Sequence, residues 1–405
     1  MSARLLRLVA LVAILAMVVA ACGDGGSDED PAEDTEAATE ETEAPAEETE
    51  APTEDTEAPA EEEEEPMEEE EEAPEEEESG GALEANILGA GASFPDPVYQ
   101  TWIGEYTTNV QPGVSIQYES IGSGGGRERF IDQQTIFAGS DAYMDDEEMA
   151  DAVDARACGE VLHIPMVFGG VVVAYNIEGL DGLVLDSATI ADIFSGEITN
   201  INDPAIAELN PDVELPDQEL TVTVRADGSG TTSIFTTYLE DEDADWAADY
   251  GAGDEVDWFG GQVAGEQNDG VASAIAQQPG GIGYVSLEFA VQQGLPTVGV
   301  VNGDGNAIVP STDTVGAAVE GIDLPEDLRF DVLGVGAEGY PIAGATWVLA
   351  YTCGYDQGDA DALKDYLTWA LEEGDSFAAD LGYAPLSDAT QELSLAKVEQ
   401  INADG

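Results

Sequence analysis

The chain has 405 residues, of which 88 are Asp or Glu and only nine are Lys or Arg, so its formal charge at pH 7 is −79. This charge argues against nucleic acid and anionic lipid surfaces as binding partners, because both would be repelled. An acidic surface with so little Lys is typical of a protein that works in high salt, where screening removes self-repulsion. At about 150 residues per domain, the length predicts two or three structural units.

Residues 1–21 have the pattern of a signal peptide. Arg4 and Arg7 precede the apolar run LVALVAILAMVVAA, which is short for a transmembrane helix and is followed by polar sequence. The run ends in VVAAC, which is similar to the lipobox of bacterial lipoproteins. This similarity implies cleavage before Cys22 and attachment of lipid to Cys22. An ordinary signal peptide followed by a chance cysteine is the alternative.

Residues 22–82 are predicted to be the lipidated cysteine and an acidic tether. Between residues 28 and 78, 29 of 51 residues are Asp or Glu and none is Lys or Arg. Such a sequence cannot bury a core and its charges repel one another, so we expect an extended disordered spacer. At about 3.1 Å per residue, its reach is on the order of 150 Å. A spacer that holds a domain off a membrane is the simplest interpretation, and an acidic binding tail is the alternative.

From residue 83 onward, short runs rich in β-branched residues alternate with helical patterns. VSIQYESIG, TIFAGSD and LTVTVRAD predict strands, whereas DPVYQTWIGEYTTNV, SIFTTYLEDE and NDGVASAIAQQ predict helices. This alternation predicts an α/β fold with largely parallel sheets. More than 300 residues favour two lobes over a single sheet.

Three predicted strands are followed by loops of Gly, Ser and Thr that lead into helices. The loops are GAGASFPDP at 89–97, GSGGGRERF at 122–130 and GSGTTSIF at 228–235. Each would present backbone N–H groups at a helix N-terminus, where an oxyanion binds readily and glycine allows close approach. A simple helix cap is the better explanation of any one loop taken alone. Three such loops, with Arg225 leading into the third, favour an oxyanion site.

Asp141, in FAGSDAYM, would restrict which oxyanions such a site can bind. It could simply be the N-cap of the helix predicted for DDEEMADAVDA. Alternatively, an ionised carboxylate only accepts hydrogen bonds, so a neighbouring anion must carry a proton. Phosphate carries one at neutral pH and sulfate does not, so Asp141 would select phosphate against sulfate.

The composition argues against an enzyme. The single histidine, His163, lies in the strand-like VLHIPMVF, GDSF at 374–377 lies in a helical pattern, and no Walker lysine follows a Gly-rich loop. We therefore expect no catalytic residue, metal or cofactor, with a phosphatase-type enzyme as the minor alternative. Cys158 and Cys353 could form one disulfide, although their spacing alone does not show that they meet.

The quoted motifs occur in an order that resembles a known family. LGAGASFPDPVYQTW, SIGSGGG, FAGSDAYM, IPMVFGGVVVAYN, VRADGSGTTSIFTTYL, GGIGYV and LGYAPL together resemble the phosphate-binding proteins of bacterial high-affinity phosphate ABC transporters, the PstS family. RADGSGT is the specific motif, and the resemblance runs from about residue 86 to the C-terminal region. It implies a type II periplasmic-binding-protein fold, in which two α/β lobes joined by hinge strands close on one phosphate.

The resemblance also implies where the lobes divide and which partners the chain has. Lobe I would comprise 83–174 and 343–405, lobe II would comprise 175–342, and the chain would cross between them near 173–176 and 340–346. The protein would be a monomer, anchored by lipid to the outer face of the cytoplasmic membrane, which delivers phosphate to the permease of an ABC transporter. Binding of sulfate, molybdate or phosphonate is the alternative function.

The site residues follow motif by motif. The residues that the resemblance implies for phosphate binding are Ser93, Phe94, Ser123, Asp141, Arg225, Ser229, Gly230 and Thr231, with Asp227 holding Arg225 in place. One departure is Gly124, where the family commonly has a second Ser, so one minor contact would be missing. The acidic tether and the near absence of Lys are also unusual, and they leave the docking surface for the permease undetermined.

Overall fold

The computed structural model describes residues 82–404, which lie within one compact unit. The predicted signal peptide, Cys22 and all but the last residue of the predicted tether lie outside the described residues. Among residues 82–404, no helix combines the length and the apolar character needed to cross a membrane.

The core of the fold is one eight-stranded sheet with the strand order β2-β1-β3-β11-β4-β8-β6-β7. Its strands are β1 (Ala85–Gly91), β2 (Val114–Ser120), β3 (Phe137–Ser140), β4 (Val161–Asn176), β6 (Thr221–Arg225), β7 (Val263–Gly265), β8 (Gly281–Ser286) and β11 (Ala343–Tyr351). A smaller sheet has the order β10-β9-β5, with β5 (Val184–Leu185), β9 (Gly299–Val301) and β10 (Ala307–Ile308).

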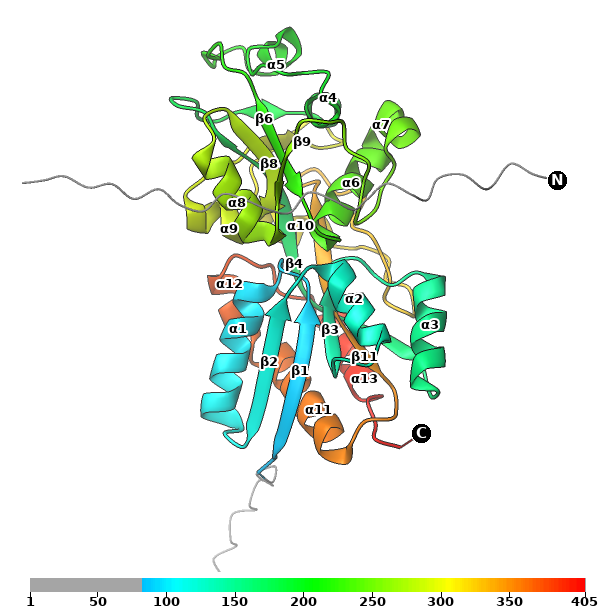
Figure 1. Cartoon of the computed structure of the whole chain (residues 1–405). Coiled ribbons are helices and arrows are strands. Elements are labelled where there is room, and N and C mark those ends of the chain that lie inside the picture. Colours follow the sequence, from blue (N-terminus) through cyan, green and yellow to red (C-terminus); the bar gives the residue numbers. More distant parts are fainter. Residues whose placement is uncertain (1–81, 405) are drawn as a thin grey trace, which may run out of the picture. The chain divides into compact units, whose positions relative to one another are not determined.

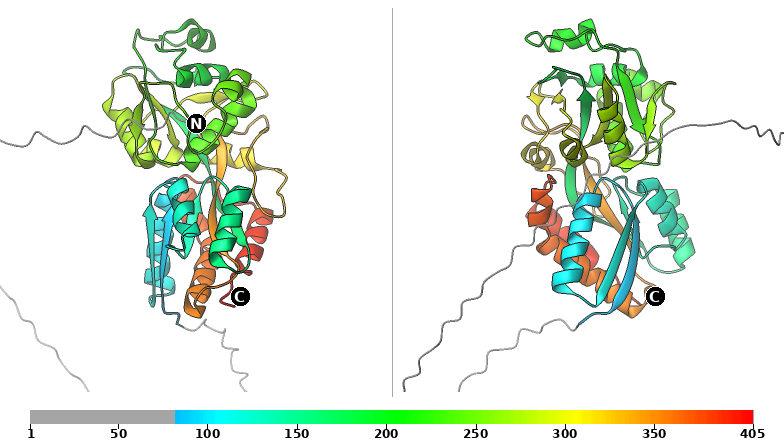
Figure 2. Two further views of the ribbon diagram at one scale, coloured as in Figure 1. Left: turned by 45° about the vertical axis from the view of Figure 1, so that its right-hand side comes forward. Right: turned by 60° about the vertical axis from the view of Figure 1, so that its left-hand side comes forward.

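Strand β4 divides the large sheet into two halves. Its residues 161–170 pair with β11, and its residues 171–176 pair with β8. We call β2, β1, β3, β11 and residues 161–170 the first half, and residues 171–176, β8, β6 and β7 the second half. In Figures 1 and 2, β4 and β11 run between the two halves. All but the last residue of β4 is buried, which explains why its sequence is apolar without alternation.

The predicted strand–helix alternation is confirmed, but the sheet is less parallel than expected. The pairs β1–β2, β1–β3, β6–β7, β6–β8 and β5–β9 are parallel. The antiparallel pairs of the large sheet, β3–β11, β4–β11 and β4–β8, all involve the two strands that link the halves. The chain enters the second half through β4 and returns to the first half through β11, so these two neighbouring strands run in opposite directions. Local strand patterns do not reveal strand direction.

Helices cover both halves of the sheet. Those of the first half are α1 (Asp96–Glu105), a π-helical turn (Tyr106–Val110), α2 (Ser123–Ile131), α3 (Asp146–Arg156), α11 (Gln357–Glu372), α12 (Asp375–Asp380) and α13 (Asp388–Val398). The helices between the strands of the second half are α4 (Ser187–Ser195), α5 (Pro204–Leu209), α6 (Gly230–Glu242), α7 (Ala244–Asp249), α8 (Gln267–Gln277), α9 (Leu287–Gln293) and α10 (Thr312–Val319). Helices α1, α2, α6 and α8 begin at the strand-end loops that concern the site.

Two further sequence features take structural roles in the first half. A disulfide joins Cys158, just after α3, to Cys353, just after β11, across 195 residues of sequence. His163 is buried in β4, and its Nε2 accepts a hydrogen bond from the Met144 N–H at 2.9 Å. Burial lowers the pKa of His163 to about 3, so it is neutral and satisfied within the core.

Candidate functional site

The three Gly/Ser/Thr loops meet where the two halves of the sheet face each other. The loops after β1 and β2 belong to the first half, and the loop after β6 belongs to the second half. In Figure 1 the arrowheads of β1 and β2 point toward the second half. The Gly124 N–H donates to the Gly228 carbonyl at 3.0 Å, so the second and third loops are in direct contact.

Arg225 is a buried cation at the end of β6, with 6 % of its surface exposed. Its guanidinium donates to both carboxylate oxygens of Asp227, with Nε 2.8 Å from Oδ1. Its Nη1 donates to Thr231 Oγ1 at 3.2 Å, in the first turn of α6. The bidentate pair with Asp227 fixes the guanidinium plane and aims its remaining donors at the N-terminus of α6.

The N-terminus of α6 supplies further donors. Ser229 is the N-cap, and its Oγ accepts the Thr232 N–H at 3.1 Å. The Ser229 N–H donates to the Asp254 carbonyl at 3.0 Å, so this N–H is already occupied. Gly230 and Thr231 occupy the first helical turn, where the N–H groups have no helical carbonyl to bind.

Ser123 and Asp141 face this helix terminus from the first half. The Asp141 N–H donates to Ser123 Oγ at 3.1 Å, and the Ser123 hydroxyl is 3.4 Å from Asp141 Oδ2. A Cβ added to Gly230 would lie 2.6 Å from both Asp141 Cβ and Ser123 Oγ. The helix N-terminus therefore contacts both residues, and only glycine at position 230 allows this approach.

Asp141 has an unsatisfied carboxylate oxygen in a buried environment. Its Oδ1 is inaccessible to solvent and has no hydrogen-bond partner among residues 82–404. Burial raises the pKa of Asp141 to about 7, and the Thr346 side chain and the positive charge of Arg225 oppose this rise. The N-cap of α3 is Asp145, which forms a capping box with Glu148. Capping of this helix therefore does not explain Asp141.

Ser93 and Phe94 bring the first loop to the same place. Ser93 Oγ accepts hydrogen bonds from the Asn268 backbone N–H at 3.2 Å and from Asn268 Nδ2 at 2.9 Å. Phe94 is fully buried, and its carbonyl accepts the Tyr383 hydroxyl at 2.6 Å. Both residues are thus held rigidly before the N-terminus of α1.

Asn268 is a site neighbour that the sequence analysis missed. It lies in the first turn of α8, and its Nδ2 also donates to Thr231 Oγ1 at 3.1 Å. Its Oδ1 accepts the Ser286 N–H at 2.9 Å. Helix α8, which contains Asn268, follows β7. It is therefore a fourth helix that begins at a strand end, and this position in the sequence is the feature that could have indicated Asn268. Its sequence, GEQNDG, lacks the Gly/Ser/Thr pattern of the other three loops.

Close packing explains why residue 124 is a glycine. A Cβ on Gly124 would lie 3.2 Å from the Gly228 Cα and 3.3 Å from Asp254 Oδ2. These separations are tight, so the close approach of the two loops disfavours a side chain here. A serine at this position would require the second loop and the third loop to move apart slightly.

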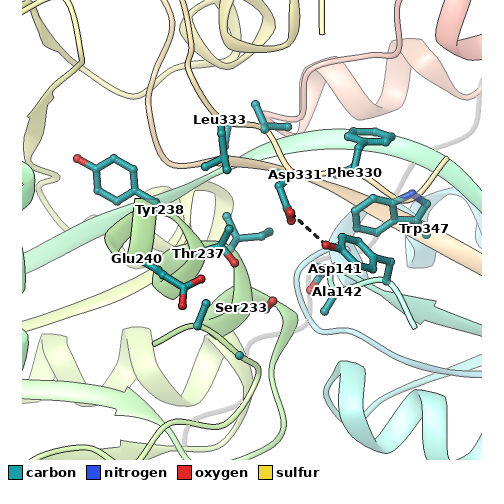
Figure 3. Close-up of a pocket in the computed structure, with 18 of the residues that line it drawn as sticks. Asp141, Ala142, Ser233, Thr237, Tyr238, Glu240, Phe330, Asp331, Leu333 and Trp347 are labelled. Carbon is teal, nitrogen blue, oxygen red and sulfur yellow. Dashed lines mark hydrogen bonds between the residues drawn. The ribbon is translucent and has the colours of Figure 1, made fainter. Parts of the chain in front are cut away.

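Two cavities border the site, and both are acidic. Asp141 borders a cavity of about 400 Å³ that is also lined by Asp145, Glu240 and Asp331. Figure 3 shows this cavity, in which the Tyr143 hydroxyl donates to Asp331 Oδ2 at 3.1 Å. Arg225 borders a second cavity, of about 570 Å³, whose acidic lining residues are Asp227, Asp249, Asp254, Glu255 and Asp257. Within the described part of the chain, Arg225 is the only cation that lines either cavity.

Comparison with known proteins places this chain in a family. A family model described as "PBP superfamily domain" matches residues 42–373. The chain is 36 % identical to the phosphate-binding protein PstS of Xylella fastidiosa (strain 9a5c) over 305 residues, which cover 74 % of this chain and 81 % of that protein. It is 34 % identical to PstS of Pasteurella multocida (strain Pm70) over 326 residues, covering 79 % and 92 % respectively. The chain belongs to the PstS family of phosphate-binding proteins.

The fold comparison agrees with this membership. This PstS-family chain superposes with a TM-score of 0.66 on the solved structure of a high-affinity periplasmic phosphate-binding protein, PfluDING, bound with phosphate. The superposition covers 79 % of this chain and 99 % of that protein, at 22 % sequence identity. The predicted type II periplasmic-binding-protein fold is therefore confirmed.

Proposed function

We propose that this chain is an extracytoplasmic receptor that captures inorganic phosphate between its two halves and delivers it to an ABC permease. The observation that carries the proposal is the meeting of one fixed guanidinium, two first-turn N–H groups and one unpartnered carboxylate oxygen at Arg225, Gly230, Thr231 and Asp141. Donors of this kind suit a tetrahedral oxyanion, and the carboxylate suits the proton of that oxyanion. Membership of the PstS family supports the same ligand.

In this proposal Asp141 accepts a hydrogen bond from the ligand, and the other predicted residues donate to it. The hydroxyls of Ser93 and Ser229 accept hydrogen bonds from Asn268 and Thr232, so the hydrogen of each hydroxyl remains free to donate. The Phe94 N–H would be a further donor of the first half. The Ser123 hydroxyl donates to Asp141 Oδ2 over a long 3.4 Å, and it would turn from this bond to the ligand. The N–H of Ser229 is excluded from this role because it binds the Asp254 carbonyl.

Selection of phosphate over sulfate is assigned to Asp141. Its Oδ1 would accept the proton of hydrogen phosphate or dihydrogen phosphate at a place where no water competes. Sulfate would instead place an unprotonated oxygen against a buried carboxylate, which costs free energy on both sides.

The proposed receptor is anchored to the membrane and has no catalytic activity. Cys22 would carry the lipid anchor on the outer face of the cytoplasmic membrane, and the protein would act as a monomeric receptor rather than as an enzyme. The lack of catalysis is supported by His163, whose Nε2 is occupied by a backbone N–H within the core. A general base for a serine nucleophile would need that nitrogen free.

Calorimetric titration of the full chain with phosphate and then sulfate, in low and in high salt, tests the proposal. We expect one-to-one phosphate binding, no sulfate binding, and a loss of well over tenfold in affinity for Arg225→Ala, since a buried charged donor is removed. Arg129→Ala is the matched control, because Arg129 forms an exposed pair with Glu119 within the first half. Near-normal binding by Arg225→Ala would contradict the assigned site. A folded wild-type chain that is silent toward phosphate would direct the search to molybdate or phosphonate.

A further inference from the structure

Arg127 is a second buried cation next to the site. It lies in the first turns of α2, directly after the glycines of the second loop, and 7 % of its surface is exposed. Its Nε donates to Glu148 at 2.8 Å, its Nη1 donates to Ser140 Oγ at 3.3 Å, and its Nη2 donates to Asp254 at 2.6 Å. Every nitrogen of this guanidinium therefore has an acceptor.

These acceptors come from different parts of the fold. Ser140 is the last residue of β3 and Glu148 lies in α3, so both belong with Arg127 to the first half. Asp254 lies between α7 and β7, in the second half. The Asp254 carbonyl also accepts the N–H of Ser229, the N-cap of α6. One residue thus connects Arg127 to the helix terminus of the site.

We infer that the ion pair of Arg127 and Asp254 is a latch between the two halves that slows the release of phosphate. The inference rests on the proposed function. Opening of the halves by a hinge motion must break this bond, whereas the bonds of Arg127 to Glu148 and Ser140 lie within one half and survive. The latch therefore stabilises the closed state, and Arg127 remains in position for the next closure. Loss of such a contact changes the dissociation rate more than the association rate.

A general electrostatic effect on phosphate predicts a different result for Asp254. Removing a negative charge beside the site would favour a bound anion, so electrostatics alone predicts tighter binding and slower release for Asp254→Ala. The latch predicts faster release for the same variant, because the bond between the halves is lost. The sign of the change for Asp254→Ala distinguishes the two explanations.

The experiment measures release of radiolabelled phosphate from the full chain into excess unlabelled phosphate. We expect Arg127→Gln and Asp254→Ala each to speed release about tenfold, less than for a fully buried pair because 28 % of the Asp254 side chain is exposed. The double variant should be no faster than the faster single variant, because both changes break one bond. Arg129→Gln, two residues further along α2, is the control and should release phosphate at the wild-type rate.

The outcomes separate this inference from the proposed function. Unchanged or slower release by Asp254→Ala, or additive effects in the double variant, would overturn the latch while phosphate binding by the wild-type chain still stands. If the wild-type chain itself binds no phosphate, the proposed function fails and the latch fails with it. Should Arg127→Gln not fold, Asp254→Ala alone still decides, because it alters a partly exposed loop residue.

Discussion

Replacing Asp141 by Asn is expected to stabilise the ligand-free protein while it weakens phosphate binding and the discrimination against sulfate. The carboxylate is buried, one of its oxygens has no partner among the residues that the structure describes, and burial raises its pKa from 3.8 to about 7. Because the pKa in the folded state lies above that in the unfolded chain, Asp141 lowers stability progressively as the pH rises from about 4 to 7. The penalty is largest above pH 7.

The size of the penalty follows from this shift. One pKa unit corresponds to about 1.4 kcal/mol, so a shift of about three units costs the ligand-free protein about 4 kcal/mol at most when Asp141 is ionised. Asn avoids the charge but buries an amide whose N–H groups need acceptors, at a cost of about 1–3 kcal/mol. We therefore expect a net gain of about 1–3 kcal/mol in the free energy of unfolding at neutral pH. Stability of Asp141→Asn should also change less between pH 5 and pH 7.

Urea denaturation of the wild type and the variant at pH 5 and pH 7, without phosphate, measures this effect. Calorimetric titration with phosphate and with sulfate then measures selectivity. Asp145→Ala is a matched control four residues along, where loss of the α3 N-cap should cost about 1 kcal/mol and leave the ratio of phosphate to sulfate affinity unchanged. A ligand-free Asp141→Asn no more stable than the wild type would refute the reasoning about its burial. An unchanged ratio of phosphate to sulfate affinity would place selectivity elsewhere.

Three further results are expected. Glu288→Gln should raise the free energy of unfolding by about 1–3 kcal/mol at pH 7. Both Glu288 carboxylate oxygens are buried without a hydrogen-bond partner within the described part of the chain, and burial raises the pKa of Glu288 to about 8. Denaturation at pH 5, where the gain should shrink, is the check. Gly230→Ala should fold but bind phosphate with an affinity lower by well over tenfold, because the added Cβ would lie 2.6 Å from Asp141 Cβ and from Ser123 Oγ. Calorimetric titration measures the affinity, and normal binding would contradict this packing. The rate of phosphate association, measured by stopped flow, should rise with ionic strength because both bordering cavities are acidic, and a fall would contradict repulsion.

The parts of the site that the sequence predicted are those encoded by short segments. The loops at 89–97, 122–130 and 228–235 each combine glycine, a hydroxyl residue and a following helix within nine residues, so local patterns suffice. That they meet depends on the position of the strands in the sheet. The parallel pairing of β1 with β2 and β3 brings the ends of these strands to one edge.

The residues that the sequence did not predict act through partners from distant segments. Asn268 contacts Ser93 across 175 positions of sequence, and Arg127 contacts Asp254 across 127. In the sequence, Arg127 stands in GRERF, where a charged residue on a helix is usually solvated. Its burial depends on contacts with Ser140, Glu148 and Asp254, which come from other segments of the chain and which no local pattern contains. The pairing of Cys158 with Cys353 stayed open for the same reason.

The charges around the site constrain how an anion can be held there. Arg225 is paired with Asp227, and Arg127 is paired with Glu148 and Asp254, so neither guanidinium contributes an uncompensated positive charge. Asp141 adds a further carboxylate when it is ionised. Net charge therefore cannot account for the binding of phosphate to this chain. In the proposed site, binding would depend on oriented donors, chiefly the N–H groups at the α6 N-terminus and the fixed guanidinium fork. Salt screens the interaction of such donors with a buried ligand only weakly. We therefore expect a site of this kind to keep its affinity for phosphate in high salt.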